Sequence, residues 1–340
     1  MKTSLIGKKP QEIEQVLQLR KSFHARQIYK WISRGATSFD QMTDLPASLR
    51  ASLSESEFCL YTTEVAAVQS DSDGTIKLLL RLFDENVVEC VLLHDKSDGL
   101  TACLSSQSGC AMGCRFCRTG TLKLKRSLTV SEICEQFLLL QGRSPGKIDH
   151  VVFMGMGEPF ANIENVLSAI DFLHDEDGIG LSMRRITIST CGVVPGIKEL
   201  TLRRVPVKLA VSLVSADDTT RSSLMPINKA YNLSTLKAAL KDFQSVSGRR
   251  FTFEYCMIHG VNISDQDAFK LASFCKGLTV VVNLIPFNPC PELEFVTPSR
   301  EEINHFCRKL DELNVPYTIR ISRGRGIKGA CGQLAGKVSG

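Results

Sequence analysis

The sequence has no long apolar run. None of its segments approaches the roughly 18 consecutive apolar residues of a membrane-spanning helix. The N-terminal stretch MKTSLIGKKPQEIEQ also lacks the apolar region of a secretion signal, and no internal repeat or low-complexity stretch is present. These absences argue against a membrane protein, a secreted protein and a repeat architecture, and they predict a cytoplasmic, globular chain.

Without a secretion signal, the 13 cysteines do not suggest a disulfide framework, because cytosolic thiols are kept reduced. Some of them are therefore expected to be ligands or reagents, and others, such as Cys134 and Cys256, small core residues. The length of 340 residues and the hydrophobic content of 43% fit one large α/β domain with a smaller attachment.

Acidic residues are missing from two basic segments. Cys110 to Ser131 and Thr318 to Gly340 each contain five Lys or Arg residues and no Asp or Glu, and Met1 to Arg34 contains eight basic residues against two acidic ones. Three separate basic patches favour a polyanionic partner, most simply nucleic acid. The alternative is an ordinary solvated surface with chance clustering.

Two patterns divide the chain. Residues 10 to 58 have apolar residues at helical spacing, and strand-like runs follow at 74–83 and 86–93, the first preceded by the turn DSDG. From Leu100 onward, strands alternate with helices, and Thr129 with Glu132 forms a capping box for the first helix. The expected strands are 101–106, 150–155, 185–190, 207–213, 251–258, 279–285 and 317–322; the expected helices include 131–142, 162–174, 233–246 and 265–275.

This alternation predicts a parallel sheet with right-handed crossovers, either barrel-like or doubly wound. In both architectures the chemistry collects at the C-terminal ends of the strands. The first 92 residues are expected to form an accessory module with linker strands, and residues 93–340 the main domain.

Three cysteines directly follow the first strand of the main domain, in SSQSGCAMGCRFCRTG: Cys110, Cys114 and Cys117. No fourth cysteine or histidine lies close by. Three thiolates hold three irons of a 4Fe–4S cluster and leave the fourth iron open to a small molecule. A zinc site needs four ligands, usually with a second C-x-x-C or C…H element, and a thioredoxin-like dithiol leaves Cys110 without a role. The open cluster is therefore the favoured interpretation, with both alternatives kept.

The next strand ends in VVFMGMGEP. Gly155 and Gly157 allow a ligand to approach the backbone, and Glu158 offers a carboxylate to an amine. Together with the cysteine loop one strand earlier, this segment is expected to seat an amino-acid-like ligand. Near the C-terminus, Cys331 lies between glycines in RGRGIKGACGQLAG, and Cys103 precedes the triplet by seven residues.

The chain resembles the RlmN/Cfr family of radical S-adenosylmethionine (SAM) RNA adenine methyltransferases, on the RlmN-like side, with a divergent paralogue as a variant of that interpretation. The resemblance extends from about residue 20 to residue 336. Its motifs, in order, are FHARQIYKWI, CLSSQSGCAMGCRFCRTG, LKRSLTVSEI, FMGMGEP, STCGVVPGI, RSSLMPIN, NLIPFNP and ACGQLAG.

The resemblance implies a partial (β/α)6 barrel with a helical N-terminal RNA-binding module. It implies a 4Fe–4S cluster on the three cysteines and two SAM molecules per turnover, one of which is split to a 5′-deoxyadenosyl radical. A flavodoxin or ferredoxin type reductant is implied as well. The expected reaction is methylation of an adenine of 23S rRNA at carbon 2, with tRNA as a second candidate substrate; the alternatives are carbon 8 or another RNA. From a different class, a zinc-stabilised, non-catalytic RNA-binding protein remains open.

The resemblance also implies residue roles. Cys331 carries the methyl group as S-methylcysteine, Cys103 resolves the protein–RNA crosslink by forming a disulfide with Cys331, and Glu89 acts as proton acceptor. The alternative for Glu89 is a surface carboxylate on an alternating strand. The implied SAM contacts are Gly157, Glu158, Ser189, Ser212, Leu213, Val214 and Asn288.

Two departures from the family pattern stand out. Val214 occupies a position where the family usually has histidine, which puts a ribose-side contact in doubt. Arg325, Gly326 and Lys328 stand where the family tends to have aspartate. This exchange of acidic for basic residues near Cys331 points to tighter RNA binding or a shifted target.

Overall fold

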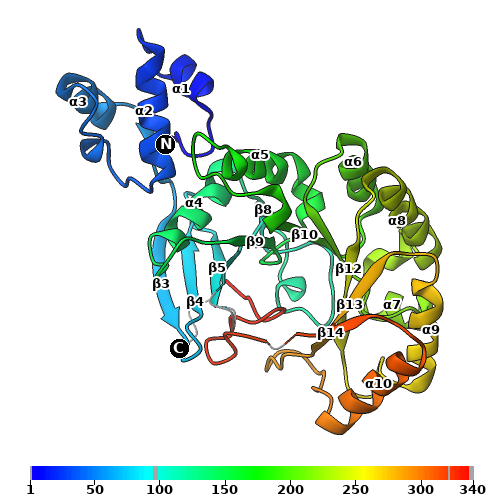
Figure 1. Ribbon diagram of the computed structural model, residues 1–340. Coiled ribbons are helices and arrows are strands. Elements are labelled where there is room, and N and C mark those ends of the chain that lie inside the picture. Colours follow the sequence, from blue (N-terminus) through cyan, green and yellow to red (C-terminus); the bar gives the residue numbers. More distant parts are fainter. Residues whose placement is uncertain (1, 95–98, 321, 337–340) are drawn as a thin grey trace.

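The computed structural model describes residues 2–94, 99–320 and 322–336. Its N-terminal part consists of α1 (Pro10–Val16), α2 (Ser22–Ser33) and α3 (Ala47–Glu55), with β1 (Thr3–Ser4) and β2 (Phe58–Cys59) paired in parallel. The helices form where apolar residues recur at helical spacing, and their inner face, including Ile28 and Ile32, is fully buried. In Figure 1 this part stands at one end of the molecule, beside α4 and α5.

A ten-stranded curved sheet forms the body of the molecule, with the strand order β14-β13-β12-β11-β10-β9-β6-β5-β4-β3. Its parallel strands are β6 (Leu100–Cys103), β9 (His150–Phe153), β10 (Ile186–Thr190), β11 (Lys208–Ser212), β12 (Phe251–Met257), β13 (Val280–Pro286) and β14 (Tyr317–Ile319). Three antiparallel strands extend it: β3 (Glu64–Ser70), β4 (Ile76–Arg81) and β5 (Val87–His94). A two-stranded ribbon, β7 (Gln107–Ser108) with β8 (Arg126–Ser127), lies in the cysteine loop.

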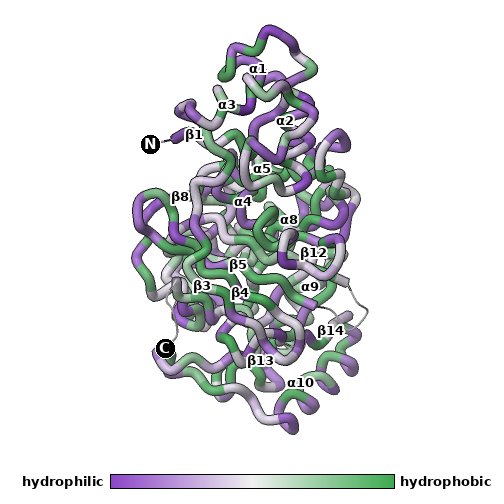
Figure 2. The backbone as a smooth tube through the Cα atoms, turned by 90° about the vertical axis from the view of Figure 1, so that its left-hand side faces the viewer, coloured by the Kyte–Doolittle hydropathy of each residue, from purple (hydrophilic) through white to green (hydrophobic). Residues whose placement is uncertain are grey.

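Helices cover the outer face of this sheet (Figure 1). They are α4 (Val130–Gln141), α5 (Ile163–His174), α6 (Val194–Arg203), α7 (Asp218–Leu224), α8 (Leu233–Ser247), α9 (Asp265–Cys275) and α10 (Arg300–Glu312). Hydrophobic residues are frequent along the strands, whereas hydrophobic and polar residues alternate along the outer helices (Figure 2). The strands are hydrophobic because parallel strands are buried on both faces. Within the described residues, no helix has the length and apolarity needed to cross a membrane.

The predicted strand–helix alternation is confirmed, with the barrel-like form of the parallel sheet. The Thr129–Glu132 capping box is also confirmed at the start of α4. Several elements had no prediction: the helices α6, α7 and α10, the strand β3, and the short strands β1, β2, β7 and β8. The antiparallel strands continue the main sheet rather than packing with the N-terminal helices. The domain limit between residues 92 and 93 stays a prediction.

The sheet does not close on itself, since β14 and β3 are its two ends. The segment after β14 runs back from that edge toward β3, β4 and β5, as the red trace in Figure 1 shows. It is held there by the β3–β4 turn, where Asp73 Oδ2 accepts the Gly324 N–H at 2.9 Å and Asp71 Oδ2 accepts the Gly326 N–H at 2.9 Å. This segment, which contains Cys331, therefore bridges the two ends of the sheet.

Candidate active site

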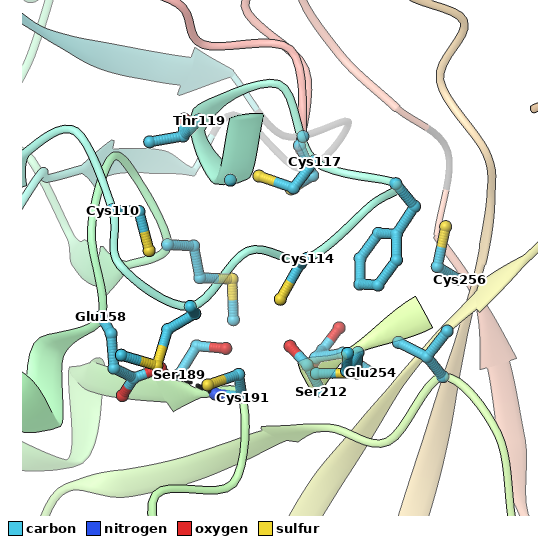
Figure 3. A pocket seen from close by; sticks show the side chains of 18 of the residues that line it. Cys110, Cys114, Cys117, Thr119, Glu158, Ser189, Cys191, Ser212, Glu254 and Cys256 are labelled. Atoms are coloured by element: carbon cyan, nitrogen blue, oxygen red, sulfur yellow. Dashed lines mark hydrogen bonds between the residues drawn. The ribbon is translucent and has the colours of Figure 1, made fainter. Parts of the chain in front are cut away.

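The cysteine loop between β6 and α4 lies over the C-terminal ends of the parallel strands. Cys110, Cys114 and Cys117 line a cavity that is open to solvent, called the first cavity below (Figure 3). The loop folds back tightly on itself. A Cβ added at Gly109, where φ is +77°, would lie 2.2 Å from the Lys123 carbonyl oxygen, and one at Gly120 would lie 2.5 Å from that of Cys114.

The three thiols fit a cluster better than a single ion. Burial raises the pKa of Cys110 to about 11 and also raises the pKa of Cys114 and Cys117. The charge of Cys117 adds to the rise in the pKa of Cys110 and Cys114, and that of Cys331 adds to the rise in the pKa of Cys117. Such thiols are deprotonated when a metal ligates them. In the described part of the chain, however, no three His, Cys, Asp or Glu side chains are grouped closely enough to hold one metal ion. Three thiols on the wall of one cavity suit three irons of a 4Fe–4S cluster, whereas a closed zinc site needs four ligands.

A buried arginine holds the strand ends beside the cysteine loop. Arg221, from the RSSLMPIN motif, is fully buried and donates to the carbonyl oxygens of Leu213 at 3.1 Å and Cys191 at 2.8 Å. It also donates to Asn228 Oδ1 at 2.6 Å. Burial lowers its pKa. Arg221 thus ties the end of β10 to the end of β11. Its motif was named in the sequence analysis, but this role was not predicted.

The GMGEP segment approaches its neighbours as closely as its glycines allow. A Cβ at Gly155 would lie 2.6 Å from Ser105 Oγ, and one at Gly157, where φ is +99°, would lie 2.5 Å from Gln107 Cβ. The Glu158 carboxylate is buried, and accepts the Phe160 N–H at 3.1 Å and the Cys191 N–H at 2.8 Å. Burial raises its pKa.

Six of the seven expected SAM contacts line the first cavity: Gly157, Glu158, Ser189, Ser212, Val214 and Asn288. Leu213 does not. Its side chain is fully buried in the hydrophobic core, and its backbone groups bond to Glu254 and Arg221. Alternation along β11 accounts for this, because Ser212 and Val214 face the cavity and Leu213 faces the helices. The assignment of these residues to SAM stays a prediction.

Val214 has an unusual backbone. Its φ is +61°, a left-handed conformation that a β-branched residue rarely adopts. The position is fixed on both sides, since the Val214 N–H donates to the Glu254 carbonyl at 3.4 Å and the Val214 carbonyl accepts Asn262 Nδ2 at 2.7 Å. Strain of this kind costs about 1–3 kcal/mol and concentrates at functional sites.

We expect Val214→His to bind SAM several-fold more tightly and to be no less stable than the parent chain. Histidine tolerates positive φ better than valine, and its ring adds a polar atom on the cavity wall. Equilibrium dialysis with S-adenosylhomocysteine and thermal unfolding check this. Val214→Ile, which keeps the branched shape, is the control and should gain nothing; weaker binding by the histidine variant would contradict the prediction.

Cys331 lies between two cavities. It lines the first cavity, and it also lines a second one together with Cys103, Arg320 and Arg323. Both Cys103 and Cys331 are free thiols. Burial raises the pKa of Cys103 to about 12, and the nearby Cys331 contributes to the rise. The two cysteines, 228 positions apart in the sequence, are thus brought together as expected.

The loop that carries Cys331 is pinned on both sides. Asn288 Nδ2 donates to the Cys331 carbonyl at 3.0 Å, and the Arg118 N–H donates to the Gly332 carbonyl at 2.7 Å. Thr119 Oγ1 donates to the Leu334 carbonyl at 2.7 Å. A backbone hydrogen bond therefore joins the cysteine loop directly to the loop that carries Cys331.

Glu89 is a buried residue, so the alternative of a surface carboxylate is wrong. Its Oε1 forms an ion pair with Lys77 Nζ at 2.9 Å, and the two side chains are 1% and 4% exposed. Its Oε2 accepts the N–H groups of Ala335 at 2.7 Å and Gly336 at 3.0 Å. Glu89 lines neither cavity. Its role as proton acceptor stays a prediction, and the contacts seen here anchor the segment that contains Cys331.

The basic segments differ in their availability to a partner. Arg126 is engaged internally, with Asp84 at 2.6 Å and Glu132 at 2.8 Å. Lys123 and Lys125 are exposed on the cysteine loop. Arg325, one of the residues that depart from the family pattern, donates to Asn288 Oδ1 at 3.1 Å. Lys337 lies outside the described residues.

Comparisons with known proteins match nearly the whole chain. Residues 104–272 match the model of the radical SAM superfamily, and residues 4–58 match the ribosomal RNA large subunit methyltransferase N-terminal domain. A probable dual-specificity RNA methyltransferase RlmN from Rhodopirellula baltica is 46% identical, over 93% of this chain and 85% of that one. One from Treponema pallidum is 45% identical, over 99% of this chain and 98% of that one. A crystal structure of a radical SAM methyltransferase from Sphaerobacter thermophilus has a TM-score of 0.95 and 42% identity, covering 98% of this chain and 100% of that one.

Proposed function

Because the chain belongs to the RlmN family of radical SAM RNA methyltransferases, we propose that it methylates carbon 2 of an adenine in 23S rRNA and in tRNA. The enzyme depends on a 4Fe–4S cluster and on SAM. The observation that carries the proposal is the position of Cys331, which lines the cavity of the three thiols on one side and the cavity of Cys103 on the other.

The residues of the first cavity suit both cofactors. Cys110, Cys114 and Cys117 hold the cluster, while Glu158 and the serines at the ends of β10 and β11 hold SAM. When bound, the two cofactors supply hydrogen-atom abstraction, which this reaction needs because an electron-poor ring carbon of adenine does not attack a sulfonium methyl group. The protein contributes positioning and the exclusion of water.

Cys331 and Cys103 divide the covalent work. Cys331 Sγ takes up the methyl group of one SAM in the first cavity. That methyl group would then lose one hydrogen atom to the radical chemistry that the cofactors supply, and its carbon bonds to the adenine ring, which joins the protein to the RNA. After the ring carbon has lost its proton, Cys103 Sγ attacks Cys331 Sγ from the second cavity and the bond between Cys331 Sγ and the methylene carbon breaks. The methylene carbon takes up a proton, the surplus electron returns to the cofactors, and the methylated adenine leaves behind a Cys103–Cys331 disulfide. A flavodoxin or ferredoxin type protein returns two electrons to this disulfide. The proton on the ring carbon passes to Glu89 only after the Ala335 and Gly336 N–H groups release that carboxylate.

Nucleoside analysis tests the function. Anaerobically reconstituted protein is incubated with SAM, reductant and either a 23S rRNA fragment or tRNA, and the digested RNA is analysed by mass spectrometry. We expect 2-methyladenosine from the wild-type protein and none from Cys331→Ala. Finding 8-methyladenosine alone would overturn the choice of carbon. Bound zinc in place of about four irons and four sulfides would overturn the enzyme class.

The remaining parts fit an RNA substrate. RNA recognition at a barrel mouth requires the target base to leave its stack, with basic side chains on the phosphates. We assign this second task to Lys123, Lys125 and the N-terminal helices, and we place the protein in the cytoplasm, where its RNA substrates are.

A further inference from the structure

Glu254 is a carboxylate in the first cavity to which the sequence and the family pattern assigned no role. It lies on β12, and the sheet register pairs it with Ser212 on β11 and Asn283 on β13. Its side chain points into the barrel beside Ser212 (Figure 3), and the residue is 6% exposed. A charged group at this depth needs partners on both oxygens.

Only one of its oxygens has them. Oε1 accepts Asn283 Nδ2 at 2.9 Å and Thr252 Oγ1 at 3.1 Å. Asn283 is itself oriented by Thr318 Oγ1, which donates to Asn283 Oδ1 at 2.6 Å. Oε2 is buried and has no hydrogen-bond partner among the residues that the structure describes. Seven buried side-chain polar atoms share that property in the described chain, and this is the one among them that belongs to a residue lining either cavity.

The surroundings of Glu254 affect how readily its carboxyl group carries a charge and accepts a hydrogen bond. Burial raises its pKa, and the positive charge of Arg320 together with the bonds from Asn283 and Thr252 opposes this rise. A buried oxygen without a donor costs free energy, because no hydrogen bond compensates for its lost hydration. A ligand that brings a hydroxyl or amino group to Oε2 recovers this cost on binding.

We propose that Glu254 Oε2 accepts a hydrogen bond from the adenosyl part of SAM, from a ribose hydroxyl or from the adenine amino group. The proposal rests on the proposed function in taking SAM as the ligand. Gly157 and Glu158 occupy the other side of the same cavity, near Cys110 and Cys191, so a methionine group seated there directs the adenosyl group toward Ser212 and Glu254. Glu254 lines the first cavity, which also contains the three cysteines of the loop, and not the second, which contains Cys103. It is a positioning residue.

Glu254→Gln reverses the hydrogen-bond polarity at one atom. Asn283 and Thr252 both donate, so the glutamine carbonyl faces them and its NH₂ group replaces Oε2. A donor then meets a donor. We expect the affinity of the cluster-loaded protein for S-adenosylhomocysteine, which cannot turn over, to fall about tenfold to a hundredfold in equilibrium dialysis. Glu135→Gln is the matched control, because Glu135 is equally buried but lines neither cavity, and its affinity should be unchanged.

Ligand analogues separate positioning from a structural defect. The 2′-deoxy, 3′-deoxy and N6-dimethyl forms of S-adenosylhomocysteine are compared on the wild type and Glu254→Gln. The form that lacks the bonded donor should lose affinity on the wild type and lose no more on the variant, whereas a folding defect weakens all forms alike.

Binding of S-adenosylhomocysteine by Glu254→Gln within twofold of the wild type overturns the inference, as does a loss confined to RNA binding. Failure of the wild type to bind S-adenosylhomocysteine would overturn the inference and the proposed function together. If the wild type binds it, yet forms no methylated adenosine, only the proposed function fails.

Discussion

Cys103→Ala stops after a single RNA molecule per protein, with that RNA covalently attached through Cys331. Cys103 is the thiol that shares the second cavity with Cys331, so its loss removes the group that attacks Cys331 Sγ. Multiple-turnover methylation is expected to fall roughly 100-fold or more, while adduct forms at about one per active site. A denaturing gel with end-labelled RNA counts the adduct, and mass spectrometry of the digest locates it on the peptide that contains Cys331.

Two variants serve as controls for the Cys103→Ala experiment. Cys103→Ala/Cys331→Ala should form no adduct, because the carbon carrier is gone. Cys90→Ala removes another buried thiol, one that lines neither cavity, and should turn over like the wild type. Normal turnover by Cys103→Ala would mean that Cys103 does not resolve the crosslink.

Lys77→Met should destabilise the protein by about 3–5 kcal/mol, because it leaves the carboxylate of Glu89 buried without its ion pair. Lys77 also donates to the Lys328 carbonyl at 3.4 Å, while Glu89 holds Ala335 and Gly336. The Lys77–Glu89 pair therefore holds the chain on both sides of Cys331. The variant should also show a several-fold lower fraction of methylated Cys331. Urea unfolding measures the first effect and intact-protein mass spectrometry the second.

Glu89→Gln distinguishes a brace from a proton acceptor. The amide oxygen still accepts the two N–H groups, but its NH₂ group then faces Lys77 and the buried ion pair is lost, so the variant should lose stability as Lys77→Met does. RNA adduct is therefore counted per methylated Cys331. If Glu89 removes the ring proton, this variant accumulates an RNA adduct even though Cys103 is present. If Glu89 acts only as a brace, no adduct accumulates. If Lys77→Met is as stable as the wild type, the Lys77–Glu89 ion pair does not stabilise the segment that contains Cys331.

The sequence was sufficient for the parts of the site that depend on local spacing. The cysteine triplet lines a cavity with Gly157 and Glu158, as the order of strands and loops predicted. The closeness of Cys103 and Cys331 came from the family resemblance rather than from spacing. Lys77, Arg221 and Glu254 lay beyond prediction, because the partners of each are set by strand pairing or by a distant segment.

Glu89 was considered as a surface carboxylate in the sequence analysis, but it is buried, and the fold explains why. An alternating strand in the antiparallel part of a sheet ordinarily exposes one face. Here the C-terminal segment covers that face, and it comes from almost 250 residues further along the chain. Residue periodicity along β5 holds no information about such a cover. A charged residue on a covered strand then requires its own counter-ion, which the neighbouring strand provides in Lys77.

The sheet has two free ends, and the chain that joins them carries the reactive Cys331. The wall of the first cavity and the proposed methyl carrier thus belong to one piece of polypeptide. A movement of Cys331 from one cavity to the other would therefore also move the cavity wall.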